Sequence, residues 1–299
     1  MEGLTHAQRV DSNRLIEEYF DSLMIKYRYI DSDLADTTFH FLGADFETPI
    51  LGSALGQHQR IHASGSLGYA NAIHAAGSLN FNGWMKDQDI ENIAAAGIRT
   101  IRGVKPFLDH DKIYRAIEHD EKCGAFAVCM DIDHIFERNG KYISQPSGDC
   151  GPQTVEDLKG YVKSTKLPFI LKGILTPEDA EKCVEIGVSA IIMTNHNNRL
   201  PCTVPPLVAL PQVKAVVDGR FPILVDGCIE SGVEAFKALA LGADGVLVCR
   251  ALMKEFSAGP EAVTAKLKSM TAELSGCMAN TGAPDLAHIS PDSLCRKVW

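Results

Sequence analysis

The feature of this sequence that most limits its fold is a regular alternation of short apolar runs with longer helical stretches. Near-continuous apolar runs are typical of strands that are buried on both faces of a parallel sheet. There are eight such runs, at residues 48–54, 77–83, 97–103, 125–131, 168–173, 189–195, 221–227 and 243–250. Strands that alternate with helices in this way indicate repeated βα units.

Helix start and stop signals occupy the stretches between these runs. Thr176 stands before Pro177 and two acidic residues, and Thr154 opens a similar segment. A threonine at the N-cap, a proline in the first turn and early acids are each favourable at a helix N-terminus. A third segment begins at Ser231 and ends at Gly242, and glycine commonly ends helices.

Eight βα units in one chain favour the α/β class and a closed (β/α)8 TIM barrel. An open, doubly wound sheet is the alternative, and its first turn would carry a Gly-x-Gly-x-x-Gly motif. Here Gly52 is followed by SALGQHQ, so that motif is missing. We therefore predict a single domain over residues 1–299, in which residues 48–277 form the barrel.

Two segments flank the predicted barrel. Residues 1–47 are interpreted as an N-terminal helical extension, with a helix at about 5–27 followed by an extended part, and this extension is expected to cap the bottom of the barrel. Residues 278–299 are polar and are expected to form an irregular C-terminal tail. The longest βα connection, residues 132–152, follows the fourth strand and is therefore expected at the C-terminal face, where barrel enzymes keep their chemistry.

Composition and charge exclude several classes of protein. The chain has 299 residues, 45% of them hydrophobic, and a formal net charge of -9, which favours a globular protein and disfavours nucleic-acid binding. No apolar run approaches the roughly 18 residues of a membrane span, and MEGLTHAQRV lacks the apolar region of a signal peptide. The nine cysteines include no CxxC pair. We therefore expect reduced thiols, no metal site and a cytoplasmic location.

Charged and polar residues stand where five of the predicted strands end. They are Asp131, Lys172, His196 with Arg199, Asp226 and Arg250. Singly, each of them could be a helix cap or a solvated loop residue. The C-terminal ends of barrel strands meet at one mouth, however, and charges gathered there need partners or a ligand. We therefore treat these residues as a candidate active site.

The residue types in this set suit chemistry beside a carboxylate. Arg199 is able to bind a carboxylate through two parallel hydrogen bonds, and His196 is a candidate general base. Asp131 would stabilise the resulting imidazolium, and Lys172 would stabilise negative charge on a cofactor. None of these side chains is redox-active, so oxidation would require a cofactor.

One long stretch resembles a known family. Residues 168–196, PFILKGILTPEDAEKCVEIGVSAIIMTNH, resemble the FMN-dependent α-hydroxy acid oxidases and dehydrogenases. The similarity continues through FPILVDGCIESGVEAFKALALGADGVLVCR and LSGC, up to about residue 277, and is weaker between about 45 and 138. The combination of Lys-Gly-Ile-Leu, Asn-His-x-x-Arg and Asp-Gly makes the resemblance specific.

The resemblance implies an FMN enzyme that oxidises a 2-hydroxy acid to a 2-oxo acid. It implies that His196 is the catalytic base, that Asp131 is paired with it, and that Lys172 lies beside the flavin. Arg199 would bind the substrate carboxylate, and Arg138 would be a second substrate-binding arginine. The electron acceptor stays open between oxygen, a quinone and another carrier. The family also forms tetramers or octamers, so a homo-oligomer is expected.

The resemblance also assigns a set of residues to FMN. It comprises Ser53, Ala54, Asn82, Arg102, Lys172, Asp226, Gly227, Cys228, Cys249 and Arg250. The last five of these stand at the ends of the seventh and eighth strands, where barrels commonly bind phosphate.

Three departures from the family pattern affect this site. Glu230 stands where the family has a phosphate-binding arginine, so we predict weaker FMN binding because like charges repel. Val104 stands in place of a tyrosine, and the loop after the fourth strand is short. Both changes predict a more open pocket for a bulkier acid.

Two other functions stay open. One is an FMN-dependent isomerase of the type 2 isopentenyl diphosphate isomerase kind, which shares this barrel. The pair His196 and Arg199 suits a carboxylate better than a diphosphate. The other is a barrel without catalysis that binds a flavin or another ligand. Glu230, Val104 and the lack of a convincing counterpart of the family's N-terminal tyrosine motivate this alternative.

Overall fold

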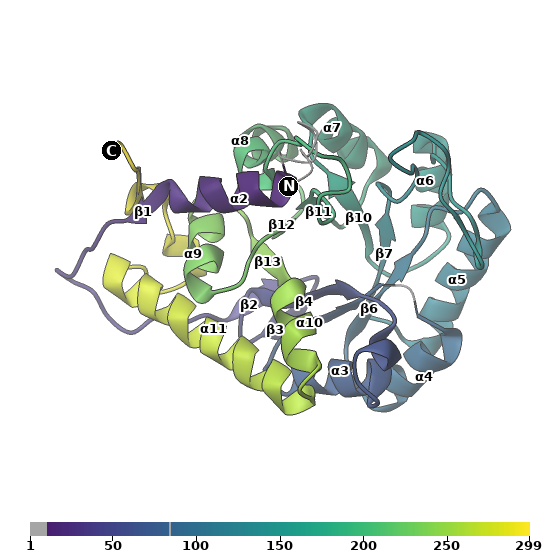
Figure 1. Cartoon of the computed structure of the whole chain (residues 1–299), viewed down its shortest axis with the longest axis horizontal. Helices are drawn as coiled ribbons and strands as arrows, with labels where there is room; N and C mark the ends of the chain where they lie inside the picture. The colour runs from purple at the N-terminus through teal and green to yellow at the C-terminus, as the bar shows by residue number, and fades with distance from the viewer. Residues whose placement is uncertain (1–10, 84) are drawn as a thin grey trace, which may run out of the picture.

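The computed structural model describes residues 11–83 and 85–299. In these residues, eight parallel strands close into a barrel in chain order, and the last strand pairs with the first (Figure 1). The strands are β4 (Ile50–Leu55), β5 (Asn80–Asn82), β6 (Thr100–Val104), β7 (Ala127–Asp131), β10 (Phe169–Ile174), β11 (Ala190–Thr194), β12 (Ile223–Asp226) and β13 (Gly245–Val248). Each overlaps one of the predicted runs, so the predicted TIM barrel is confirmed.

Helices surround the barrel (Figure 1). They are α3 (Gly65–His74), α4 (Asp87–Ala95), α5 (His110–Cys123), α6 (Val155–Lys163), α7 (Pro177–Ile186), α8 (Pro206–Val217), α9 (Gly232–Ala240), α10 (Arg250–Phe256) and α11 (Pro260–Thr281). The side chains of Thr154, Thr176 and Ser231 each accept a hydrogen bond from the backbone N–H three residues later. The three predicted helix starts are therefore confirmed.

The N-terminal helix differs from the prediction in length and position. Helix α2 spans Ser12–Asp21, while residues 5–10 of the predicted helix lie outside the described residues. It stops there because the next residues form β1 (Leu23–Ile25), which pairs with β14 (Leu294–Arg296). Helix α2 lies at the mouth, where the amide nitrogen of Asn195 donates to Asn13 at 3.3 Å. The prediction that residues 1–47 cap the bottom of the barrel is therefore wrong for their helical part.

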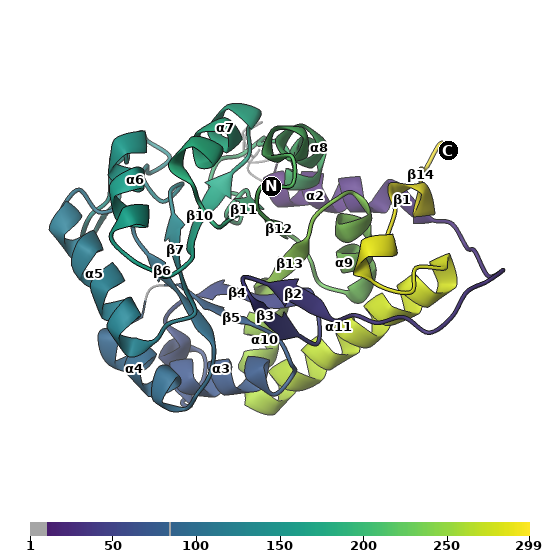
Figure 2. The ribbon, with the colours of Figure 1, turned by 180° about the vertical axis from the view of Figure 1, so that it is seen from behind.

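A hairpin covers the bottom instead. Strands β2 (Phe39–Phe41) and β3 (Ala44–Phe46) pair antiparallel, and Figure 2 shows them across that end of the barrel. Their phenylalanines are buried in one cluster with the side chains that fill the barrel interior. Burial of this apolar surface explains why the extended part of the N-terminal segment closes the barrel.

Two other segments differ from the prediction in detail. Helix α11 continues to Thr281, four residues past the expected end of the barrel, and β14 ties the C-terminal tail to the N-terminal segment. The long connection after β7 contains a small hairpin, β8 (Ser144–Gln145) with β9 (Gly148–Asp149). In the part of the chain that the structure describes, no helix is both long and apolar enough to cross a membrane.

The core has an inner and an outer layer, and this division decides which side chains reach the mouth. The inner layer includes Phe81, Ile101, Cys129, Ile170, Ile192, Leu224 and Leu247. Side chains along a strand alternate between its two faces. The residue two positions after each inner residue therefore points to the axis again, now at the C-terminal end.

Candidate active site

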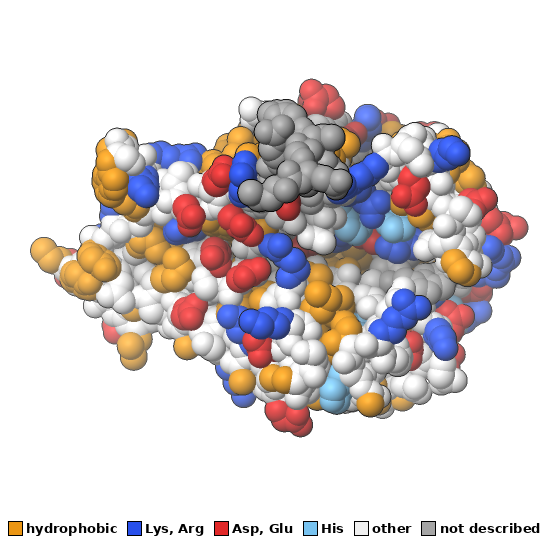
Figure 3. All heavy atoms as spheres, viewed as in Figure 1, with side chains coloured by type: hydrophobic (Ala, Val, Ile, Leu, Met, Phe, Trp, Pro, Cys, Tyr) orange, Lys and Arg blue, Asp and Glu red, His pale blue; other side chains and the backbone are white. Residues whose placement is uncertain are grey.

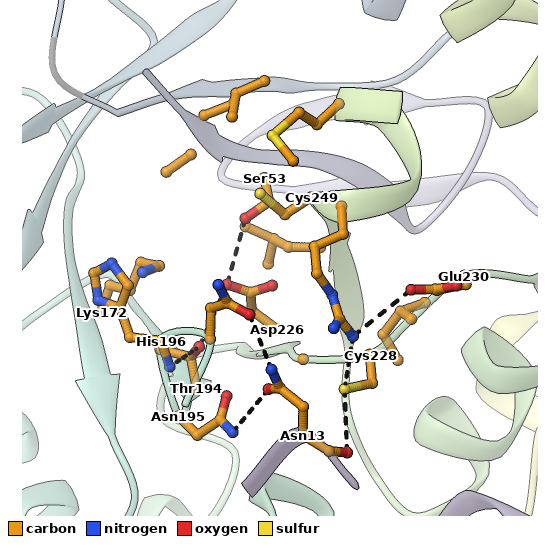
Figure 4. A pocket seen from close by; sticks show the side chains of 18 residues that line it. Asn13, Ser53, Lys172, Thr194, Asn195, His196, Asp226, Cys228, Glu230 and Cys249 are labelled. Carbon is orange, nitrogen blue, oxygen red and sulfur yellow. Dashed lines mark hydrogen bonds and ion pairs between the residues drawn. The ribbon is translucent and has the colours of Figure 1, made fainter. Parts of the chain in front are cut away.

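A pocket opens at the C-terminal ends of β4, β10, β11, β12 and β13. Figure 3 shows a hollow on this face, with Lys, Arg and His side chains around it. Figure 4 shows that the labelled side chains converge on the pocket from separate strands and loops. The predicted residues in its lining are Ser53, Ala54, Lys172, His196, Asp226, Gly227, Cys228, Cys249 and Arg250. Closure of the barrel thus brings together nine residues that are dispersed in the sequence.

Asp131 lies between two buried lysines. Its Oδ1 is 3.1 Å from Lys172 Nζ, and its Oδ2 forms a close ion pair with Lys105. Burial disfavours the charged form of Asp131, but the two ammonium groups outweigh it and hold the pKa of Asp131 well below its ordinary value. Burial likewise opposes the charge of Lys172, yet the nearby carboxylates raise the pKa of Lys172. Asp131 and Lys172 are therefore both ionised at neutral pH.

The carboxylate that contacts His196 is Asp133. His196 Nδ1 lies 2.9 and 3.0 Å from the two oxygens of Asp133, whereas both oxygens of Asp131 face lysines. The predicted pairing of His196 with Asp131 is therefore wrong in this structure. Burial raises the pKa of Asp133, but the hydrogen bond to His196 and the charge of Lys172 lower it overall. Asp133 is thus an ionised acceptor for the Nδ1–H group.

The loop that carries His196 has a strained backbone. His196, Asn197 and Asn198 have φ angles of 47°, 56° and 60°, a left-handed region that non-glycine residues rarely occupy. Helix α2 holds this loop from outside. The Nδ2 of Asn13 donates to Asn197 at 2.9 Å, and the backbone N–H of Ser12 donates to Asn198 at 3.1 Å.

Two arginines and a histidine lie beside this loop. Arg199 Nη2 donates to His134 Nδ1 at 2.7 Å, while its Nε is buried and has no partner among the described residues. Burial, together with the charges of Lys105 and Arg199, lowers the pKa of His134 to about 3, so this ring is neutral and accepts. Arg138 donates to the carbonyl oxygens of Asn198 and Arg199 at 2.7 and 3.2 Å.

Two residues assigned to FMN point away from the mouth. Arg102 Nη1 lies 3.0 Å from Asp120 and 2.9 Å from Asp87, on the helices outside the barrel. Asn82 Nδ2 donates to Thr100 Oγ1 at 2.8 Å. Because the preceding residues, Phe81 and Ile101, face inward, the next residue on each strand must face outward. The predicted location of Asn82 and Arg102 at the flavin is therefore wrong.

Strand alternation also decides where the side chain of Val104 points. Its side chain is buried in the outer layer, so the prediction that Val104 opens the pocket is wrong. Gly103 and Lys105 occupy the inward positions. Lys105, Asp133 and His134 were missed as site residues. Counting by two from the apolar Ile101 would have found Lys105, whereas Asp133 and His134 lie on a loop without a periodic signal.

Arg250, at the predicted phosphate-binding end of the pocket, lies close to a thiol and two carboxylates. Arg250 Nη2 lies 3.0 Å from the sulfur of Cys228 and 3.6 Å from a carboxylate oxygen of both Glu17 and Glu230. Arg250 and Glu230 both line the pocket. The departure at Glu230 thus lies beside the cation that would meet a phosphate.

The donors of this pocket fit FMN. The pairing of β4 with β5 skips between Gly52 and Leu55, so the backbone of Ser53 and Ala54 is outside the regular ladder at the pocket wall. Lys172 is 3% exposed and enters the same pocket as an ionised donor. Lys172 and the backbone stretch at Ser53 and Ala54 provide partners for a ring system with polar edges, and Arg250 provides a partner for a phosphate.

A family model and a plant enzyme match most of this chain, and a bacterial enzyme matches a shorter part of it. A family model described as FMN-dependent dehydrogenase matches residues 5–145 and 145–296. The peroxisomal (S)-2-hydroxyacid oxidase GLO3 of Arabidopsis thaliana is 29% identical over 91% of this chain and 84% of its own length. The L-lactate oxidase of Alicycliphilus denitrificans is 40% identical, over 46% of this chain and 39% of its own length.

Solved structures agree with the sequence matches. A mandelate oxidase variant with a monooxide FMN adduct superposes with a TM-score of 0.87 at 27% identity, covering 99% of this chain and 94% of that one. Mandelate oxidase with 3,3-difluoro-2-hydroxy-3-phenylpropionic acid gives a TM-score of 0.86 at 27% identity, covering 99% and 92%. The predicted FMN cofactor and oxidoreductase class are confirmed at the level of the family. With its closed barrel and convergent strand ends, this chain belongs to the family of FMN-dependent α-hydroxy acid oxidases and dehydrogenases.

Proposed function

We propose that this enzyme oxidises a 2-hydroxy acid to the corresponding 2-oxo acid, with His196 as the general base. One observation carries the assignment. The ionised Asp133 accepts from Nδ1–H of His196, and this contact selects the tautomer whose lone pair is on Nε2. His196 also lines the pocket that holds Lys172. A proton acceptor and a buried cation thus face one cavity.

Bound FMN supplies the two-electron acceptor for this oxidation. Conversion of a 2-hydroxy acid to a 2-oxo acid removes two electrons and two protons, and His196 Nε2 takes one of these protons. Lys172 stabilises negative charge at the cofactor from inside the pocket. Arg250 and the backbone of Ser53 and Ala54 would hold the cofactor in place.

Arg199 is proposed to bind the substrate carboxylate. Its Nε is buried without a partner in the described part of the chain, and one Nη group already donates to neutral His134. The remaining N–H groups of a guanidinium are arranged to meet both oxygens of a carboxylate. Arg138 is proposed to assist from the rim, where it now binds backbone carbonyls of the same loop.

The relatives suggest the class of substrate. Their names or titles contain (S)-2-hydroxy acids, L-lactate and (S)-mandelic acid. We therefore propose (S)-2-hydroxy acids as substrates, with the carboxylate on Arg199 and the hydroxyl-bearing carbon beside His196.

An anaerobic screen of 2-hydroxy acids, followed by flavin absorbance, tests this function. The enzyme should bleach with at least one (S)-acid, and His196→Ala should slow that bleaching about 10²–10⁴-fold while FMN stays bound. Bleaching of the variant at the parental rate would remove His196 from this role. A flavin that no acid bleaches, in a protein that isomerises isopentenyl diphosphate after chemical reduction, would favour the isomerase.

A further inference from the structure

We propose that Asp133, and not Asp131, positions His196 and stabilises its protonated form, while Asp131 holds Lys172 in a bridge with Lys105. This inference rests on the proposed function, because it concerns the group that acts through His196. It assigns two different tasks to two carboxylates that are separated by one residue at the end of the same strand.

Asp131 forms ion pairs with two lysines. One of its oxygens pairs with Lys172 and the other with Lys105, and its side chain is 4% exposed. A protonated His196 that turned toward Asp131 would bring a further positive charge to a carboxylate that two lysines already face. Like charges in a buried site repel one another. Asp131 is therefore better suited to fix Lys172 than to orient His196.

Asp133 has the geometry of a positioning residue. Both of its oxygens lie within 3.0 Å of His196 Nδ1, and its side chain is 19% exposed. An ionised acceptor on Nδ1–H selects the tautomer with a free Nε2, and it stabilises the imidazolium after proton transfer.

The backbone beside Lys172 leaves space for Asp133. Gly173 has a φ of +111°, and a Cβ atom built there would lie 2.7 Å from Cβ and Cγ of Asp133. The β10–β11 register shifts between Lys172 and Ile174, so this irregularity surrounds the glycine. A side chain at position 173 would push Asp133 away from His196.

Kinetics of the holoenzyme test the assignment. We expect Asp133→Asn to slow anaerobic flavin reduction by at least 10²-fold, in line with other acids that orient a catalytic histidine. In a His196→Ala background the same change should cost less than about 2-fold, because Asp133 acts only through His196. Asp131→Asn should slow reduction by a similar factor in both backgrounds. If Asp133 had only a structural role, Asp133→Asn would also slow reduction by the same factor in the parental and the His196→Ala backgrounds.

Other outcomes overturn the inference or the function separately. If Asp131→Asn loses its effect in the His196→Ala background and Asp133→Asn does not, the two roles are reversed and the inference fails. If His196→Ala reduces flavin at the parental rate, the proposed function fails first. If flavin reduction is slow in His196→Ala but keeps the parental rate in Asp133→Asn, the inference fails and the proposed function stands.

A glycine pair provides a second test if Asp133→Asn does not fold. Gly173→Ala and Gly187→Ala both place a side chain at a positive φ, but nothing lies within 4 Å of a Cβ at Gly187. Gly173→Ala should slow flavin reduction at least 10-fold more than Gly187→Ala. Equal rates in the two variants would show that displacement of Asp133 has no consequence, which contradicts the inference.

Discussion

At the scale of single residues, the phosphate end shows how one substitution changes a binding site. Arg250 shares its guanidinium between the thiol of Cys228 and two carboxylates, Glu17 and Glu230. A phosphate would bring further negative charge to the same cation, so the carboxylates oppose its binding. We therefore predict that Glu230, at the position of the family's phosphate-binding arginine, weakens FMN binding.

We expect Glu230→Arg to tighten FMN binding about 10-fold or more, because it removes a repulsive charge and adds an attractive one. Arg250→Ala should weaken binding by a larger factor. Titration of apo-protein with FMN, followed by flavin fluorescence, measures both dissociation constants. Glu18→Arg is the control, since Glu18 pairs with Arg14 on the same helix as Glu17. An unchanged dissociation constant for Glu230→Arg would show that Glu230 does not act on the phosphate.

Arg199→Lys should raise the KM for the substrate at least 10-fold and leave FMN affinity unchanged. A lysine does not reproduce the two parallel hydrogen bonds of a guanidinium to a carboxylate, and it loses the geometry of the contact to His134. Steady-state kinetics and a flavin titration measure the two effects. Equal affinity of both forms for a competing 2-oxo acid would contradict carboxylate binding by Arg199.

At the scale of elements, helix α2 is a clamp for the loop that carries His196. Three consecutive left-handed residues cost on the order of 1 kcal/mol each. The bonds from Ser12 and Asn13 to Asn198 and Asn197 offset part of this cost. The N-terminal segment thus acts on the active site from outside the barrel.

Asn13→Ala should therefore slow flavin reduction by about 10-fold, because the loop gains conformations in which His196 is misplaced. Asn71→Ala, at an exposed position of helix α3, is the matched control and should have no effect. Stopped-flow reduction with one saturating substrate compares the two variants. A parental rate for Asn13→Ala would show that the loop keeps its conformation without the helix.

At the scale of the whole molecule, buried neutral histidines connect stability to pH. His58 is fully buried, its ring lies 4.6 Å from that of Tyr69, and burial lowers the pKa of His58 to about 4. Its unfolded value is near 6.5. Below pH 6.5, His58 binds a proton in the unfolded chain but stays neutral in the folded protein until the pH approaches 4. The free energy of unfolding therefore falls as the pH decreases toward 4.

We expect the free energy of unfolding to decrease between pH 6.5 and pH 4.5, and His58→Phe to reduce that slope. Urea unfolding at a series of pH values measures both slopes. His74→Phe, at an exposed position of helix α3, is the control and should leave the slope unchanged. Parallel slopes for the parent and His58→Phe would contradict the role of His58.

The sequence by itself determined the barrel, because alternation of apolar strands with capped helices is a local pattern. It also determined the residues whose strand and face follow from that pattern. Lys172, Asp226 and Cys249 each stand two positions after an inward apolar residue, and all three reach the pocket. Similarity to the family identified FMN as the cofactor and the strand ends that form the pocket.

Only the tertiary structure decided which groups meet. A shift of one residue turns a strand side chain to the other face, so Arg102 points to the helices and Lys105 to the mouth. The Asp133–His196 contact depends on a loop and on the space above Gly173. The position of helix α2 depends on contacts between residues more than 180 positions apart. Pairings of this kind have no local signal in the sequence, because they result from the closure of the barrel.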